Sequence, residues 1–380
     1  MNFEFSEEQE HLRKSVRDFA TQEVAPHVME WDEAQEFPTE AIRKCGELGY
    51  MGSIFPEQYG GAGLSYIDYA IIVEELARVD PSVGLIVAAH TSLCSNHIYL
   101  AGDEAQKQKY LTKLATGEWI GCWSLTEPEA GSDAAGTRSV AVRDGDGWIV
   151  NGSKTFTTNA HNADVCVAMA VTDRASSQRG ISAFLFEKGM AGFRLGKKEN
   201  KMGFRASSTG EVLFENCRLA GAQLLGKEGE GFVDSLRTLD GGRISIAALS
   251  IGIAQGAYEA ALRYARQRKQ FGRFISEFQA IQHKLADMAT SLEASRLLTY
   301  KAAARKDAGL RVTSESAMAK LFASEAAVSI CNEALQIHGG YGFIKDYPVE
   351  KFYRDVKLMT IGEGTSEIQR LVIARQLLNV

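Results

Sequence analysis

Residues 140–152 read VAVRDGDGWIVNG, and this stretch decides the fold class. Alternating apolar and polar residues flank two Asp-Gly pairs, a pattern typical of a β-hairpin. Three more short runs rich in β-branched and aromatic residues follow, namely DVCVAMAVT (164–172), GISAFLFE (180–187) and EVLFENCRL (211–219). The sequence therefore predicts a small all-β unit over residues 118–228.

Helical patterns lie on both sides of this β unit. Ser6 and Gln9 have capping-box spacing, and Pro81 disfavours helix at the residue before it, so one helix begins near Ser6 and another ends near Asp80. The stretch SIAALSIGIAQGAYEAALRYARQRK contains no proline and many small residues, which predicts a long helix packed closely on its neighbours. Besides the helix that begins near Ser6, the predicted helical segments are 39–49, 67–80, 82–102, 103–117, 245–269, 276–306 and 312–338, before a terminal helix. The three predicted parts are an N-terminal all-α domain (1–117), a central β domain (118–228) and a C-terminal helical domain (229–380).

The bulk composition is that of a soluble globular protein. The chain has 380 residues, of which 45% are hydrophobic and 24% charged, and its net charge of −6 gives no electrostatic reason to expect a nucleic-acid partner. No apolar run approaches the roughly 20 residues that cross a membrane. The acidic, amphipathic N-terminus resembles neither a signal peptide nor a transit peptide. We therefore expect a cytoplasmic protein without membrane insertion, and the mitochondrial matrix only if a transit peptide has been removed.

The cysteines and histidines give no reason to expect disulfides or a metal. The six cysteines are scattered and contain no CxxC pair, so we interpret them as buried, reduced thiols. His90 and His97 could share one helix face, but neither has an obvious third ligand nearby in the sequence.

Two stretches of the β unit admit both a structural and a ligand-binding interpretation. WSLTEPEAGSD (123–133) is either a connecting loop or a loop whose Thr126 and Ser132 hydroxyls and backbone N–H groups bind a flat heterocycle. In NGSKTFTTNA (151–160), strand alternation would put Phe156 and Thr158 on one face. Phe156 is then either a core aromatic or a wall against a cofactor ring.

Three stretches of the C-terminal part raise the same choice. In LDGGRI, Asp240 and Arg243 stand three residues apart at the head of a helix, either as a solvated ion pair or as contacts to a polar ligand. In RKQFG, Arg268 suits a diphosphate. In QIHGGYGF, Gly339 and Gly340 can offer backbone N–H groups to phosphate or sugar oxygens. No GxGxxG follows a strand, so a Rossmann site is not indicated.

The stretch IGEGTSEIQR (361–370) holds one carboxylate, Glu363, between Gly362 and Gly364. Glycines flank a side chain where the backbone bends sharply or passes close to another group. Glu363 is therefore either a cap for the last helix or a base held against a substrate.

Taken together, these motifs resemble the acyl-CoA dehydrogenase family of flavoenzymes. The resemblance runs from SEEQ to RQLLNV and rests on FPEQYGGAG, DEAQKQKYLTKLATGE, SLTEPEAGSD, DGGR, RKQFG, QIHGGYGF and EGTSEIQR, in that order. It implies an α+β multidomain fold with an N-terminal helical domain, a β-barrel-like or sandwich domain and a C-terminal four-helix bundle. It also implies FAD, an acyl-CoA substrate, electron-transferring flavoprotein as the electron acceptor and a homotetramer built as a dimer of dimers. The sequences of the LDGGRI and EGTSEIQRLVIA motifs favour short-chain or short branched-chain substrates, oxidised to the trans-2-enoyl-CoA.

The resemblance assigns roles to individual residues. Glu363 matches the catalytic base, whose pKa would rise on burial beside an acyl chain, and whose N–H would polarise the thioester carbonyl. The acyl-CoA contacts would be Ser132, Asp240, Arg243 and Gly364. The FAD contacts would be Trp123, Leu125, Thr126, Ser132, Phe156, Thr157, Thr158, Arg268, Phe271, Gln279, Gln336, Gly339, Gly340, Thr365 and Glu367, partly across a subunit boundary.

The chain also departs from the family pattern. Some members take the base from the helix with the DGGR-like motif, and Gly242 occupies that position here. Glu129 stands where many members have glycine, and Phe156 where several have tryptophan. Two alternatives stay open: another flavin-dependent oxidase or monooxygenase on the same fold, or a non-catalytic helical binding protein.

Overall fold

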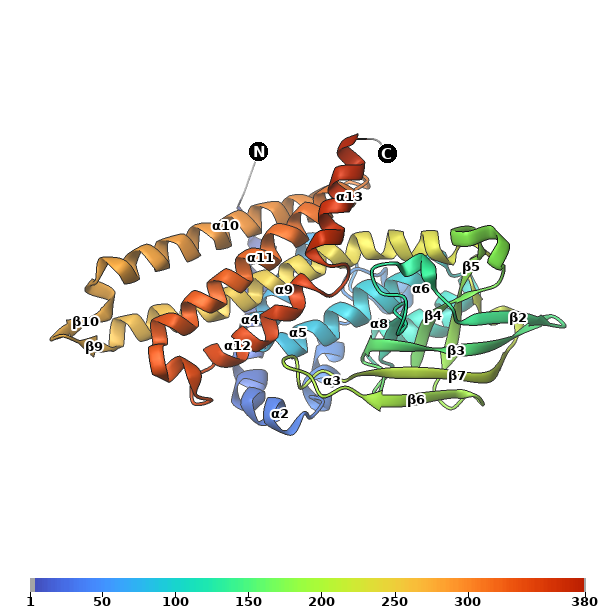
Figure 1. Ribbon diagram of the computed structural model, residues 1–380, viewed down its shortest axis with the longest axis horizontal. Helices are drawn as coiled ribbons and strands as arrows, with labels where there is room; N and C mark the ends of the chain where they lie inside the picture. Colours follow the sequence, from blue (N-terminus) through green and yellow to red (C-terminus); the bar gives the residue numbers. More distant parts are fainter. Residues whose placement is uncertain (1–3, 379–380) are drawn as a thin grey trace.

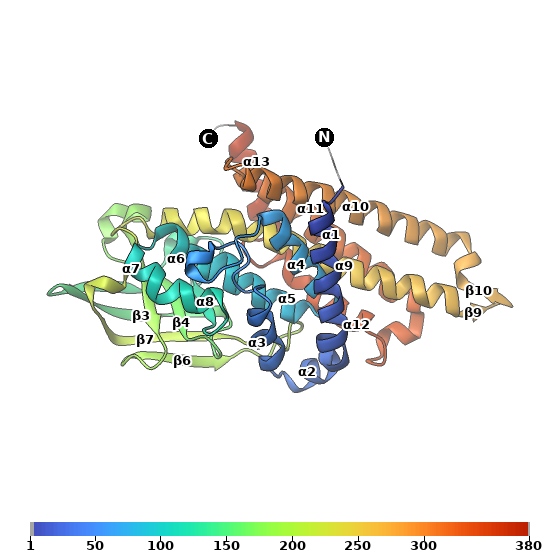
Figure 2. The same ribbon diagram turned by 180° about the vertical axis from the view of Figure 1, so that it is seen from behind.

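The protein is elongated, with a β-sheet at one end and a bundle of long helices at the other (Figure 1). This computed structural model describes residues 4–378. The N-terminal helices pack along the middle of the molecule, between the sheet and the far end of the bundle (Figure 2). The helical, β, helical order predicted from the sequence is confirmed.

The N-terminal part is helical, and its helices begin where side chains can cap them. Ser6 and Gln9 form the predicted capping box of α1, and Ser65 with Asp68 forms another at α4. The predicted buried helix over 82–102 is observed as α5 and α6, joined without a break by a π-helical segment over Ala89–Ser95. The helices are α1 Glu7–Phe19, α2 Val28–Ala34, α3 Thr39–Glu47, α4 Tyr66–Val79, α5 Pro81–Ala88, α6 Asn96–Ala101, α7 Glu104–Gln106 and α8 Thr112–Ala115.

The central part is an eight-stranded sheet in the order β6-β7-β3-β2-β4-β5-β8, with β1 paired to β4. The predicted hairpin forms β2 and β3, which turn between Asp144 and Gly147. β1 overlaps only the first two residues of the stretch interpreted as a loop (123–133), and β6 is a charged strand at the sheet edge. Neither strand has an apolar alternation that predicts it. The strands are β1 Gly121–Ser124, β2 Val140–Asp144, β3 Gly147–Thr158, β4 Val165–Val171, β5 Ile181–Glu187, β6 Phe193–Lys198, β7 Thr209–Leu219 and β8 Leu224–Leu225.

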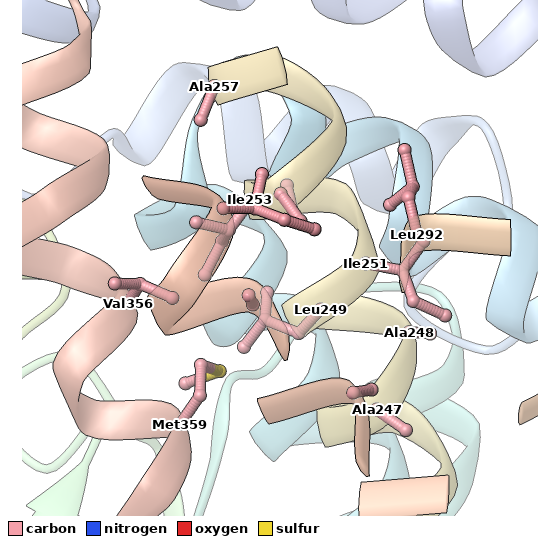
Figure 3. Close-up of a cluster of buried hydrophobic side chains, with 14 of the residues drawn as sticks. Ala247, Ala248, Leu249, Ile251, Ile253, Ala257, Leu292, Val356 and Met359 are labelled. Atoms are coloured by element: carbon pink, nitrogen blue, oxygen red, sulfur yellow. The ribbon is translucent and has the colours of Figure 1, made fainter. Parts of the chain in front are cut away.

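The C-terminal part is built around α9, a helix of 37 residues. Small residues let α9 lie close to α4, because a Cβ at Gly252 would stand 2.3 Å from the carbonyl oxygen of Glu74. Its alanine and isoleucine side chains pack with α10 and α12 in the largest core cluster (Figure 3). The elements are α9 Gly231–Gln267, the short hairpin β9 Lys269–Gln270 and β10 Arg273–Phe274, α10 Gln279–Asp307, α11 Thr313–His338, α12 Val349–Val356 and α13 Ser366–Leu378.

Helix α9 is a core helix. Of the helices in residues 4–378, it alone has the length and composition of a membrane span, but 83% of its apolar window is buried inside the protein. Its start also corrects one expectation. Asp240 and Arg243 lie in the interior of α9 and not at its head, because the helix already begins at Gly231. The Gly241-Gly242 pair weakens helix formation locally, but packing against neighbouring elements overrides that preference.

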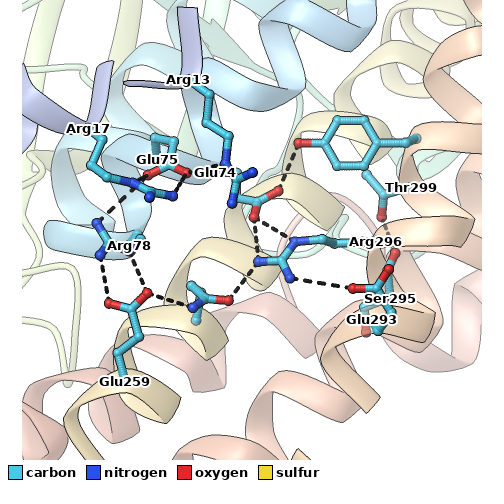
Figure 4. Close-up of polar contacts among 12 residues, drawn as sticks. Arg13, Arg17, Glu74, Glu75, Arg78, Glu259, Glu293, Ser295, Arg296 and Thr299 are labelled. Carbon is cyan, nitrogen blue, oxygen red and sulfur yellow. Dashed lines mark hydrogen bonds and ion pairs between the residues drawn. The ribbon is translucent and has the colours of Figure 1, made fainter. Parts of the chain in front are cut away.

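Buried ion pairs join the N-terminal and C-terminal helices (Figure 4). Glu74 of α4 accepts hydrogen bonds from Arg296 and Tyr300 of α10. Arg78 of α4 pairs with Glu259 of α9 at 2.7 Å. Within the N-terminal part, Glu75 accepts from Arg13 and Arg17 of α1. Because the carboxylates of Glu74 and Glu75 are almost fully enclosed, they need such partners to stay buried as charges. The domain limits at residues 118 and 228 fall in connections between elements, and the independence of the three parts stays a prediction.

Lys351 of α12 forms a second buried group of charges with Asp80 and Asp355, at 2.8 and 2.7 Å. Asp355 also accepts the backbone N–H of Phe204, in the loop between β6 and β7. This group therefore ties α12, which leads towards Glu363, to both other parts of the chain.

Candidate active site

Glu363 lies in a tight turn between the 3-10 segment Lys357–Thr360 and α13. Its φ of +52° is in the left-handed region, and the following Gly364 has a φ of +93°. Such a conformation at glutamate costs about 1–3 kcal/mol and persists only where neighbours hold it. Here Gln369 Nε2 donates to the carbonyl oxygens of Glu363 and Gly364, at 3.1 and 2.9 Å. Lys320 Nζ of α11 donates to the Gly364 carbonyl at 2.7 Å.

The carboxylate of Glu363 points into the protein, against α9. A Cβ at Gly242 would stand 2.3 Å from Glu363 Oε2, so only glycine at this position leaves room for the carboxylate. The residue as a whole is half-buried, but Oε2 itself is enclosed and has no hydrogen-bond partner among residues 4–378. Burial raises the pKa of Glu363 to about 7, and the positive charges of Lys320 and Arg243 act in the opposite direction. This carboxyl group can therefore both hold and release a proton near neutral pH.

Asp240 and Arg243 form the predicted i, i+3 ion pair, at 2.8 Å. The solvated-face interpretation is wrong, because Arg243 is almost fully buried. Asp240 also accepts a hydrogen bond from the Thr313 hydroxyl at 2.6 Å. The Nε atom of Arg243 is enclosed and unpartnered within the described part of the chain. The charges of Arg243 and Glu363 act on one another, and each of these two residues keeps one buried polar atom without a partner within residues 4–378.

The two predicted flavin-facing stretches of the β unit lie side by side. The Ser124 and Thr157 hydroxyls are 2.7 Å apart, and the Thr155 N–H donates to the Thr126 carbonyl at 2.9 Å. Below them, Lys154 Nζ donates to Glu127 at 2.7 Å. Trp123 and Leu125 on the first stretch and Thr158 on the second are half-buried, and Ser132 is exposed.

Phe156 is not a core aromatic. Its side chain is 65% exposed, and its φ of +55° falls in a β-bulge between Lys154 and Thr157. The bulge also breaks the simple alternation used to group Phe156 with Thr158. An exposed phenyl ring next to the hydroxyl-bearing residues Thr157 and Thr158 is a suitable wall for a flat ring system.

The remaining predicted cofactor residues lie elsewhere in the chain. Arg268, Gly339 and Gly340 line a cavity of about 550 Å³ with Tyr264, His338 and Tyr341. Phe271 is 92% exposed at the tip of the β9–β10 hairpin, and Gln279 and Gln336 are also exposed. The hairpin lies at the end of the molecule opposite the sheet (Figure 1). One chain therefore does not bring this group together with Phe156.

Thr365 and Glu367 lie beside the base. They line a second cavity of about 370 Å³ with Lys357, Thr360 and Glu325. This cavity opens next to the turn that carries Glu363, so the turn contacts both the buried side of α9 and a polar hollow at the surface.

The donor groups present fit FAD in type. A flavin ring needs an apolar face and donors for its polar edge, which Phe156 and the 123–132 loop offer. A diphosphate needs a fixed positive charge and backbone N–H groups, which Arg268, Gly339 and Gly340 offer. FAD, when bound, supplies the hydride acceptor that no side chain can replace.

Three family profiles match the chain in order. They are described as Acyl-CoA dehydrogenase, N-terminal domain (residues 6–118), middle domain (122–217) and C-terminal domain (229–378). The chain belongs to the acyl-CoA dehydrogenase family. The predicted fold class and family are thereby confirmed, and the protein is an FAD-dependent acyl-CoA dehydrogenase.

Individual relatives of this acyl-CoA dehydrogenase cover almost the whole chain. The short-chain specific acyl-CoA dehydrogenase of Clostridium acetobutylicum is 50% identical over 98% of this chain and 99% of its own. The solved butyryl-CoA dehydrogenase from Megasphaera elsdenii is 42% identical, with a TM-score of 0.98 and 100% of both chains covered. A chain from a structure described as the electron transferring flavoprotein of Acidaminococcus fermentans is 48% identical, with a TM-score of 0.99 and 100% of both chains covered. A solved FAD complex of PigA, 31% identical with a TM-score of 0.96, covers 99% of each chain.

Several residues of the dehydrogenase site were missed from the sequence. Lys320 and Gln369 hold the base turn, and the Lys154–Glu127 pair holds the flavin-facing stretches. His97 accepts a hydrogen bond from the Trp123 indole at 2.9 Å. One signal was available in the sequence, namely the lysine within the alanine-rich helical run AMAKLFASEAA. Such a run is typical of a buried helix, and lysine is rarely buried.

Proposed function

We propose that this enzyme oxidises a saturated short-chain or short branched-chain acyl-CoA to the trans-2-enoyl-CoA, with Glu363 as the base that removes the α-proton. The observation that carries the proposal is the enclosed, unpartnered Oε2 of Glu363, seated against Gly242. An ordinary buried carboxylate has donors on both oxygens, because an unpaired one is costly. A carboxylate kept without a donor is free to accept a proton from a substrate.

The surroundings of Glu363 suit proton abstraction next to a thioester. The α-hydrogen of a thioester is a weak acid, so its base needs a pKa well above that of an exposed glutamate. Burial raises the pKa of Glu363 to about 7. The N–H of Glu363 donates no backbone hydrogen bond within residues 4–378, so it can donate to the thioester carbonyl as the enolate forms. The acceptor for the β-hydrogen, which leaves as hydride, would be supplied by bound FAD.

The finer assignments rest on the relatives. A short acyl chain is supported by the similarity to the short-chain specific and butyryl-CoA enzymes. Transfer of electrons to electron-transferring flavoprotein is supported by the Acidaminococcus fermentans structure. A homotetramer, built as a dimer of dimers, would bring the Arg268 cavity of one subunit to the Phe156 face of another, since one chain holds them apart. We infer a cytoplasmic enzyme from its bacterial relatives.

An oxidase or monooxygenase on the same fold is the alternative chemistry. Both differ from a dehydrogenase in how fast the reduced flavin reacts with oxygen. The enclosed base argues against a monooxygenase, which can omit α-proton removal. An acyl-CoA oxidase needs the same base, so the rate at which the reduced flavin reacts with oxygen is what separates it from a dehydrogenase.

The test is anaerobic titration of Glu363→Gln and wild type with butyryl-, hexanoyl- and octanoyl-CoA, following flavin absorbance. Wild type should bleach fastest with butyryl-CoA and react slowly with oxygen afterwards. Glu363→Gln should bind FAD and acyl-CoA but lose about 10²- to 10⁴-fold in bleaching rate. Glu30→Gln, an exposed carboxylate on α2, is the matched control and should behave as wild type. Bleaching of Glu363→Gln at the wild-type rate would refute the base assignment.

A further inference from the structure

Lys320 is a fully enclosed lysine in the middle of α11. Its neighbours on the buried face are small residues, Ala317, Ala323 and Ser324, so nothing in the local sequence calls for a long cation. Burying an ammonium without compensation costs several kcal/mol, and a methionine of similar length would fill the same space without that cost. A lysine at such a place therefore needs a reason beyond packing.

The bonding of Lys320 is unusual for a buried lysine. Its Nζ donates to the Gly364 carbonyl at 2.7 Å, the peptide next to the base. In the described part of the chain no carboxylate lies within 4.0 Å of this Nζ, unlike Lys154 and Lys351, which each form an ion pair. Burial lowers the pKa of Lys320 to about 8, and Glu363 acts against that shift. The lysine is therefore attached to the base turn and coupled to the base charge without touching it.

The groups that face Glu363 come from three helices: Lys320 of α11, Arg243 of α9 and the Tyr69 hydroxyl of α4. Arg243 is already paired with Asp240 at 2.8 Å, which offsets much of its charge. Lys320 in turn is faced by Arg243, by Glu367 of α13 and by Glu325 of its own helix. Among these groups, Lys320 is the cation with no bonded carboxylate.

We propose that Lys320 is a positioning residue for Glu363, which fixes the base turn through the Gly364 carbonyl and supplies a positive charge near the base carboxylate that is not bonded to any carboxylate in residues 4–378. The inference rests on the proposed role of Glu363. Two effects follow from the same ammonium. The bond to Gly364 helps to hold the left-handed turn, and the charge favours the ionised form of Glu363, which is the form that accepts a proton.

The test compares pH profiles of kcat/KM for wild type, Lys320→Met and Lys320→Gln, each loaded with FAD and assayed with butyryl-CoA. Loss of the charge should move the acidic limb of the profile upward by about one pH unit or more, because a nearby opposite charge shifts a carboxyl pKa by about 1–3 units. The ratio of wild-type to Lys320→Met kcat/KM should therefore be about tenfold or more larger at pH 6.5 than at pH 9. The deficit should shrink above pH 8, where wild-type Lys320 loses its own charge.

The controls separate charge from packing. Lys320→Gln keeps a donor but no charge, so it should show the same shift with a smaller loss of thermal stability. Lys301→Met removes an exposed lysine on α10 and should leave the acidic limb of the pH profile at its wild-type pH. FAD content and the melting temperature are measured for each variant, and Lys320→Gln serves if Lys320→Met does not fold.

The outcomes are distinct from those for the base itself. An acidic limb at the wild-type pH in both Lys320 variants, with activity reduced evenly at every pH, would overturn the inference and leave Lys320 as packing only. That result would not touch the base assignment as long as Glu363→Gln is inactive. An active Glu363→Gln would instead remove the proposed function on which this inference rests.

Discussion

Glu127 and Glu363 are both enclosed carboxylates next to a buried lysine, but their surroundings differ. Glu127 accepts from Lys154 Nζ at 2.7 Å and from the N–H groups of Arg138 and Ser139, at 2.7 and 3.0 Å. Burial pushes the pKa of Glu127 upward, but these donors outweigh it and leave that pKa below its ordinary value. Burial raises the pKa of Glu363 to about 7, since its Oε2 has no donor within residues 4–378.

The difference separates a structural charge from a reactive one. Lys154 bonds directly to the carboxylate of Glu127, so the pair fastens the 123–132 loop to β3. Lys320 bonds to the peptide beside Glu363 and leaves the carboxylate open. The number of donors on the carboxylate, and not its burial, decides which of the two can accept a proton from a substrate.

The largest expected effect comes from moving the base across the active site. Glu363→Gly should lose about 10²- to 10⁴-fold in turnover. Gly242→Glu in the Glu363→Gly background should regain at least about tenfold, because the two positions meet at the same point and the vacated space accepts a side chain from α9. The measurement is steady-state turnover with butyryl-CoA.

Gly241→Glu in the Glu363→Gly background is the control for that exchange. A side chain at position 241 would point to Tyr66 and Asn96 and not to the base site. If Gly241→Glu restored turnover as well as Gly242→Glu, the direction in which α9 presents the side chain would not decide which glutamate can act as the base.

Breaking the paired glutamate should cost stability. Lys154→Met should lower the free energy of unfolding by about 3–5 kcal/mol, since it leaves Glu127 buried as an unpaired charge. The double variant with Glu127→Gln should be less destabilised than the sum of the two single variants. Denaturant unfolding measures both, and Arg194→Met, which breaks the exposed pair with Glu215, should cost less than about 1 kcal/mol.

The effect of pH on the free energy of unfolding should have the opposite sign for Glu363 and Glu127. A carboxyl group whose pKa is higher in the folded state binds its proton more tightly there, so wild type loses stability as the pH rises from 4.5 to about 7. Glu363→Gln cannot titrate, so at pH 8 it should be more stable than wild type by about 3 kcal/mol. This advantage should fade to zero below pH 4.5. A constant difference between pH 4.5 and 8 would contradict the raised pKa.

The smallest effect is expected at Glu129. Its carboxylate pairs with Arg138 across the flavin-facing loop, and both side chains are more than half exposed. Exposed pairs contribute about 0–1 kcal/mol, so Glu129→Gly should change the melting temperature and the FAD content little. A large loss of FAD would show that this departure from the family pattern shapes the loop.

The elements that could be predicted from the sequence are those with local patterns. The β2–β3 hairpin follows from the Asp-Gly pairs, and α4 ends at Val79, ahead of Pro81. The start of α9 was misplaced because the Gly241-Gly242 pair looks like a helix boundary, whereas its real role is to make room for Glu363 and Tyr66. That role depends on residues more than a hundred positions away, which no local pattern contains.

The candidate site was predictable only in part for the same reason. Glycines on both sides of Glu363 indicated a special turn, and the resemblance added the role of base. Lys154 and Lys320 were missed because a lysine within a strand or a helix is normally exposed, and only tertiary packing buries these two. Phe156 was ambiguous because a bulge, and not the strand alternation, decides which way it points.

Helix α9 determines the distance between two of its contacts, at Gly231 and at Gly242. At Gly231 it touches β5, since a Cβ there would stand 2.4 Å from the Ala183 nitrogen, and at Gly242 it touches Glu363. These two anchors lie about 16 Å apart along one uninterrupted helix. Inserting or deleting one residue between them would rotate the second anchor by about 100° and shift it by about 1.5 Å. Substitutions at the exposed positions Val233, Leu236 and Arg237 would therefore leave both anchors in place, whereas a change in residue count would separate Gly242 from Glu363.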